Sequence, residues 1–192
     1  GISATYNFSP TQELVLQVTN IRNGEDKDMY IYGRPEGVGK AKIPVITTLN
    51  WNSWYADKAV QLRYAAAWGQ QAKGKNILYL TVGNIYEKGP IIAYLDVMYA
   101  REGLDSHGII TDMQGPAIHT PTTAMNTEYL TFIADVDYRF HPHWNAYIKG
   151  AYETAGVYKE NGIFEKGLYR TTWNLQGCIE FFPMANSELK IF

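Results

Sequence analysis

Two aspartates two residues apart, Asp135 and Asp137, have the spacing in this sequence that most resembles a catalytic pair. Two carboxylates on one face of an element can divide the roles of general acid and general base. These two lie in a segment of alternating polar and apolar residues, where positions i and i+2 face the same side of a strand. Such neighbours are more often solvated side chains of one strand face, and we expect no catalytic role for them.

Four histidines and a glycine-rich stretch give further candidates for chemistry. His141 and His143 flank a proline in a predicted tight turn, but a metal site needs ligands that the sequence does not place beside them. His107 and His119 fall in a long loop, whereas a hydrolase needs such groups at a strand end, held by a rigid scaffold. Residues 37–40 (GVGK) lack the first glycine, the Ser or Thr after the lysine and the helix of a phosphate-binding loop. We expect no catalytic residue, no metal and no cofactor, and predict that the protein is not an enzyme.

The composition narrows the range of partners. With 17 Lys and Arg against 19 Asp and Glu in 192 residues, the chain has no basic surplus for a phosphate backbone, so we expect no nucleic-acid partner. Its 15 Tyr and 5 Trp, beside 19% charged residues, are typical of rings that lie between an apolar layer and water. The single cysteine, Cys178, cannot form an internal disulfide. No run reaches the roughly 18 apolar residues of a membrane helix, a length that tilted membrane strands do not need.

The strongest pattern is alternation with a period of two, in blocks of about eight to twelve residues. In the block 129–140 the even-numbered residues are apolar, whereas the odd-numbered ones include Asp135, Asp137 and Arg139. The pattern predicts an all-β fold of about ten strands, connected as an antiparallel, up-and-down meander. The predicted strands are 2–8, 13–19, 43–53, 59–68, 77–83, 94–100, 129–140, 144–153, 169–182 and 188–192.

The predicted connections alternate between tight turns and longer loops. The turns are 8–12, 54–58, 86–90, 141–143 and 183–186, and the longer connections are 20–42, 69–76, 101–127 and 154–168. Bacterial membrane barrels have short periplasmic turns and longer outer loops, so we predict a single domain, residues 1–192, that forms a transmembrane β-barrel. The first predicted strand runs into a tight turn, the last one leaves one, and the start is not that of a signal peptide. We therefore expect this chain to be part of a larger barrel; the alternative is that its strands close on themselves.

In such a barrel the two faces of each strand meet different surroundings. The charged rows would face the interior, where both signs line a pore or brace a packed core, and aromatic residues near the tight turns would form a girdle at one membrane level. The predicted pore-lining residues are Arg63, Asp96, Asp135, Asp137, Arg139, Lys149, Arg170 and Glu180. The predicted girdle residues are Trp51, Trp54, Tyr55, Tyr138, Phe140, Trp144 and Phe181.

Two stretches in the second half of the chain resemble a known family. They are residues 138–144 (YRFHPHW) and 173–184 (WNLQGCIEFFPM), the latter with a glycine, an aromatic pair and a Pro-Met turn at a strand end. In these stretches the chain resembles the C-terminal part of the porin O and P family. The resemblance implies a passive channel in the bacterial outer membrane, monomeric or homotrimeric and in contact with outer-membrane lipid. Phosphate-selective members are expected to carry a ladder of basic side chains, whereas the charged row of this chain mixes both signs.

These patterns predict a porin-like outer-membrane channel for the passive diffusion of small polar or ionic solutes, anions among them. A lumen lined by both signs would have a weak ion preference. Two alternatives stay open on the sequence. One is a soluble lipocalin-like barrel whose apolar faces turn inward around an apolar ligand. The other is an outer-membrane barrel enzyme with a Ser-His or Asp-His constellation at its outer rim.

Overall fold

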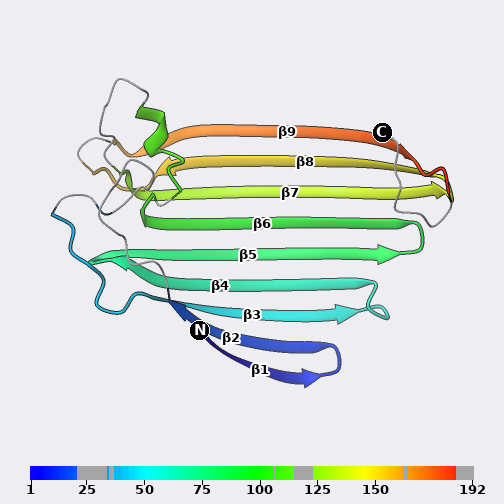
Figure 1. Cartoon of the computed structure of the whole chain (residues 1–192), viewed down its shortest axis with the longest axis horizontal. Helices are drawn as coiled ribbons and strands as arrows, with labels where there is room; N and C mark the ends of the chain where they lie inside the picture. Colours follow the sequence, from blue (N-terminus) through cyan, green and yellow to red (C-terminus); the bar gives the residue numbers. More distant parts are fainter. Residues whose placement is uncertain (21–33, 35–36, 106, 115–122, 162–163, 185–192) are drawn as a thin grey trace.

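The computed structural model describes residues 1–20, 34, 37–105, 107–114, 123–161 and 164–184. In this part of the chain the backbone forms nine β-strands and one short 3₁₀ helix (Figure 1). No helix in these ranges is both long and apolar enough to cross a membrane. The strands are β1 (Ile2–Ser9), β2 (Gln12–Asn20), β3 (Val45–Tyr55), β4 (Val60–Ala72), β5 (Lys75–Lys88), β6 (Ile91–Leu104), β7 (Met125–His141), β8 (Trp144–Val157) and β9 (Gly167–Phe181), and the helix η1 is Thr111–Gln114.

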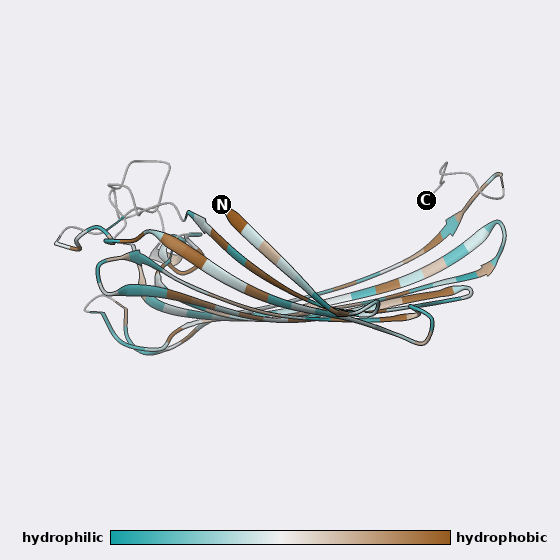
Figure 2. Cartoon of the chain, turned by 90° about the horizontal axis from the view of Figure 1, so that it is seen from below, coloured by the Kyte–Doolittle hydropathy of each residue, from teal (hydrophilic) through white to brown (hydrophobic). Residues whose placement is uncertain are grey.

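Each strand pairs with its neighbours in sequence, and every pairing is antiparallel. This order confirms the predicted all-β meander. The sheet is curved, and its two edges turn toward the same side (Figure 2). Within the described residues it is open, because the edge strands β1 and β9 pair only with β2 and β8. These nine strands thus do not close on themselves, which was the alternative to forming part of a larger barrel, and the tenth predicted strand, 188–192, lies outside the described residues.

The strand registers define two faces of the sheet, because cross-strand partners point to the same side. Phe132 pairs with Val97 on one neighbouring strand and with Tyr152 on the other, and Tyr152 pairs with Trp173. We call the side that carries this row the apolar face, and the opposite side the polar face. The alternation of apolar and polar residues appears along the strands as bands of different hydropathy (Figure 2).

The apolar face is the exposed one. On this face Val136 is 44% exposed and Trp173 is 76% exposed. Asp135, the neighbour of Val136 in sequence, points to the polar face and is 7% exposed. A soluble sheet does the reverse, since it turns its apolar face toward a core. A continuous apolar patch of this kind marks a surface that meets another protein or a membrane.

The two ends of the sheet carry different connections. At one end, which we call the tight-turn end, the connections are residues 10–11, 56–59, 89–90 and 142–143. At the other, the loop end, they are residues 21–44, 73–74, 105–124 and 158–166. One prediction was wrong: 69–76 is not a longer loop, because β4 continues to Ala72 and β5 begins at Lys75. Gly74, at φ 70°, supplies the left-handed residue that so short a turn needs.

The backbones of β3 and β4 come into close contact at Gly69 of β4, which pairs with Ile46. A Cβ atom at Gly69 would lie 2.5 Å from the carbonyl oxygen of Val45 and 3.1 Å from Cα of Ile46, so the two strands would have to separate. At Gly150 of β8, the nearest atom to an added Cβ is Cδ1 of Leu175, at 4.0 Å. The same methyl group is therefore forbidden at one glycine and tolerated at the other.

We expect Gly69→Ala to lower the free energy of unfolding by about 1–3 kcal/mol, the usual cost of forcing atoms into a packed site. Gly150→Ala is the matched control, with an expected change within about 0.5 kcal/mol. Urea titration of the protein folded in detergent micelles or lipid vesicles measures both values. Equal losses for the two variants would contradict the strand contact described here.

Candidate functional site: the polar face

One row of cross-strand partners on the polar face runs over all nine strands, from near the tight-turn end of β1 and β2 to the middle of β9. It has charged and amide side chains on most strands and small or apolar side chains on the others. Its members are Asn7, Glu13, Asn52, Arg63, Gly83, Asp96, Ile133, Ala151 and Asn174. Hydrogen bonding across the row begins between β2 and β3, where Asn52 Nδ2 donates to Glu13 Oε1 at 2.7 Å.

Gly83 separates two opposite charges in that row. Arg63 lies on one side of it and Asp96 on the other. A Cβ at Gly83 would be 2.9 Å from Asp96 Oδ1 and 3.8 Å from Cβ of Arg63, so the carboxylate leans over the glycine toward the strand that carries the arginine. The missing side chain gives the two charged groups a common space.

The eight predicted pore-lining residues all lie on the polar face. Asp135 is directly opposite Lys149, so one acidic and one basic residue of the predicted set are cross-strand neighbours. Arg170 stands apart near the loop end, opposite Ala155. Arg139 is at the tight-turn end, where its guanidinium donates to the carbonyl oxygen of Pro142 at 2.7 Å and lies 4.8 Å from the centre of the Phe182 ring.

Two further predicted residues meet around an asparagine that sequence analysis missed. The side-chain amide of Asn145 donates to Asp137 and, at 2.9 Å, to Glu180. Asn145 and Glu180 are buried, at 6% and 3% exposure. The parity of β8 puts Asn145 on the same face as Lys149, and that parity is the sequence signal that could have identified it.

At the loop end the polar face is covered by the chain itself. The connection between β6 and β7 places Ile110 and Ala124 against Ala100, Tyr129 and Ala155, all on the polar face. Ile110 and Ala124 are fully buried. The hydrophobic core of the described structure is thus a small plug between this loop and one end of the sheet.

A buried carboxylate holds this loop in place. Asp105 is fully buried. Its Oδ2 accepts hydrogen bonds from the backbone nitrogens of Ile110 and Thr111, at 2.8 and 2.7 Å, and its Oδ1 accepts one from the Tyr129 hydroxyl at 2.9 Å. The Thr111 hydroxyl also donates to it, at 2.8 Å, and in turn accepts from the backbone nitrogen of Ala124 at 2.9 Å. The carboxylate therefore ties both ends of the loop to β7.

The predicted girdle residues lie toward the tight-turn end, and six of them are on the apolar face. Trp144 packs on Phe181, with ring centres 4.8 Å apart, and Tyr138 lies 6.1 Å from Phe140. Tyr55 pairs with Val60, and Trp51 pairs with Tyr64, in the same apolar rows.

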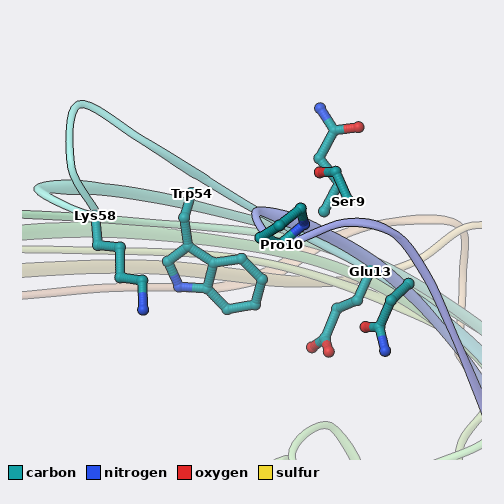
Figure 3. Close-up of a pocket in the computed structure, with 7 residues that line it drawn as sticks. Ser9, Pro10, Glu13, Trp54 and Lys58 are labelled. Carbon is teal, nitrogen blue, oxygen red and sulfur yellow. The ribbon is translucent and has the colours of Figure 1, made fainter.

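Trp54 is the exception among the girdle residues. It pairs with Gln61, so it lies near the same end of the sheet as the others but on the polar face. There it lines a hollow of about 280 Å³ together with Glu13 and Lys58 (Figure 3). The sequence argument placed it by its distance from a turn, whereas strand parity decides its face.

Three of the four histidines are described, and they lie at a turn or in a loop; His119 lies outside the described residues. The rings of His141 and His143 are 5.6 Å apart in the β7–β8 turn. His107 Nδ1 lies 3.2 Å from Glu102 at the loop end. Within the described ranges, no group of three or more His, Cys, Asp or Glu side chains is placed to hold a metal ion.

A meander with one exposed apolar face, one charged face and tight turns at one end is typical of the wall of a porin-type channel. The family model described as phosphate-selective porin O and P matches residues 1–192, and the chain belongs to this family. Searches of the curated proteins and of the solved structures each found no match. Family membership confirms the resemblance seen in the sequence. It supports a porin-like channel rather than an enzyme, and an outer-membrane setting.

The Asp105 contacts give a prediction about the loop. In Asp105→Ala, the amides of Ile110 and Thr111 lose charge-assisted hydrogen bonds worth about 1.5–3 kcal/mol. We expect these amides to exchange with solvent deuterium roughly 10- to 100-fold faster. Asp112→Ala is the control, because Asp112 is exposed in the same loop. Unchanged exchange in Asp105→Ala, measured by mass spectrometry, would show that the carboxylate does not hold the loop.

Proposed function

We propose that the protein is a passive diffusion channel of the bacterial outer membrane, with its polar face lining a water-filled interior and its apolar face in contact with lipid. The observation that carries this proposal is the separation of the two faces across nine strands. The apolar rows are exposed although they hold the largest apolar side chains, and the polar rows hold most of the charges; the Arg101–Glu128 ion pair, near the loop end, is on the apolar face.

The alternative of a soluble barrel with an apolar interior fits the faces less well. A lipocalin-like barrel packs its apolar rows inward around a ligand. Here the chain's own loop covers the polar face, where Asp105 and Tyr129 anchor it. A loop that folds into the interior of a barrel covers the inward face, so its position favours an inward polar face.

The open edges of the sheet, β1 and β9, would need partner strands in a membrane. In a hydrocarbon layer every backbone N–H and C=O group needs a partner, so strands cross membranes only in closed barrels. We propose that β1 and β9 are paired by further strands in the assembled barrel, with the tight-turn end on the periplasmic side and the loop end outside. The loop that Asp105 anchors would then narrow the outer part of the pore. The eight predicted residues from Arg63 to Glu180 would line it, and the six aromatic residues on the apolar face would form the girdle.

Conductance tests the proposal directly. The full-length protein reconstituted into planar bilayers should give stepwise increases in current as single channels insert. Insertion in groups of three equal steps would indicate a homotrimer, and single steps a monomer. Bilayers that stay silent, with protein shown to be folded and inserted, would refute the channel.

A pair of arginine substitutions tests which face meets lipid. Ala134, on the apolar face, and Ile133, on the polar face, are neighbours near the middle of β7. We expect Ala134→Arg to destabilise the vesicle-inserted protein by about 2–4 kcal/mol, the cost of a basic side chain at the bilayer midplane. Ile133→Arg should cost clearly less, because its charge would enter water. Urea titrations that give the opposite order would reverse the assignment of the faces.

A further inference from the structure

The charges of the polar face are unequal in number. Acidic side chains outnumber basic ones on the described strands, although the whole chain is close to neutral. The acidic residues are Glu13, Glu87, Asp96, Glu102, Asp135, Asp137, Glu153 and Glu180, and the basic residues are Arg63, Lys75, Arg139, Lys149 and Arg170.

The basic side chains are placed mostly away from the middle of the wall. Arg139 is drawn to the tight-turn end by its hydrogen bond to Pro142 and its stacking on Phe182. Lys75 is the first residue of β5, at the loop end, and Arg170 is near the same end. Lys149 is the basic residue nearest the middle of its strand among the described strands, and Arg63 is the fourth residue of β4, counted from the tight-turn end.

Neutral donors hold several of the carboxylates. Asn52 donates to Glu13, and Asn145 donates to both Asp137 and Glu180. An amide carries no charge, so the hydrogen bonds to Glu13 and Asp137 fix the position of each carboxylate and do not themselves neutralise it. A lysine or arginine in place of Asn52 would balance the charge of Glu13, and one in place of Asn145 would balance one of its two carboxylate partners.

We propose that this wall favours small cations over anions, inorganic phosphate included. The inference rests on the proposed channel and names its solute class. A water-filled passage lined by an excess of one sign raises the local concentration of counter-ions, and carboxylate-lined passages are the usual basis of cation preference. The wall thus departs from the phosphate selectivity in the family description, because acidic side chains outnumber basic ones on its described strands.

The reversal potential across a KCl gradient is the measurement that decides. The full-length protein in planar bilayers should give a potential whose sign shows that K⁺ passes more readily than Cl⁻, and replacing chloride by phosphate should not increase the anion current. Channels that conduct but prefer Cl⁻ or phosphate, or that show no preference, would overturn the inference and leave the channel standing. Silent bilayers would refute the channel itself, and this inference with it.

Single substitutions show whether the named carboxylates cause the preference. Asp96→Asn and Asp137→Asn should each lower the K⁺ to Cl⁻ permeability ratio by about two- to fourfold, because a charge about 10 Å from the ion path in water attracts K⁺ and repels Cl⁻ by about twofold each before salt screens it. Asp57→Asn is the matched control: it makes the same change in the β3–β4 turn, at φ 54°, a conformation that asparagine tolerates, and should leave the ratio unchanged. If all three variants behave alike, the preference does not come from the wall.

The two basic positions give an internal check that does not depend on the acidic variants folding. Lys149→Gln should raise the permeability ratio, because Lys149 is at mid-height opposite Asp135. Arg139→Gln should change it less, because that guanidinium is turned toward Pro142. A larger effect from Arg139 than from Lys149 would contradict the charge distribution described above.

Discussion

The antiparallel hydrogen-bonded register is the constraint on which the rest of the structure depends. Side chains alternate between faces along a strand, and cross-strand partners share a face, so one register error would send polar rows to the apolar side. The nine strands keep one parity throughout, from the Tyr6 and Leu14 pair to the Ile148 and Gly177 pair. The bulges occur near strand ends, as between Tyr138 and His141, where they do not disturb the middle of the sheet. The separation of charge from apolar surface follows from this regularity.

The sequence predicted the presence of the strands better than their ends. Alternation identified all nine described strands, but several are longer than predicted: at the tight-turn end β5 continues to Lys88 and β6 begins at Ile91, and at the loop end β6 continues to Leu104 and β8 to Val157. There the polar face carries Ala100 and Ala155, buried under the loop, so the sequence loses its contrast between faces. The contact of the β6–β7 loop with the polar face therefore also explains why the period-two pattern does not extend to this end of the sheet.

The site was predictable to the extent that parity determines it. Parity placed all eight charged residues on one face, but it could not place what depends on contacts between distant segments. Asp105 reads as an ordinary loop aspartate, and its role appears only when Tyr129 and the η1 segment are brought to it. Trp54 shows the converse: nearness to a turn was a weaker guide than its place one residue after Ser53, on the opposite face.

Alternation also explains how relatives can share a fold and differ in the solutes they pass. Stability in a membrane depends on the apolar rows and the backbone pairing, whereas the charges that a solute meets are on the other face. Substitution of a polar-face residue such as Lys149 or Asn145 changes the charge of that face without altering the apolar rows. A family match over the whole chain therefore predicts the architecture better than the selectivity, because the two depend on alternate residues along each strand. For this chain, the side chains on the polar face are the better guide to the solute.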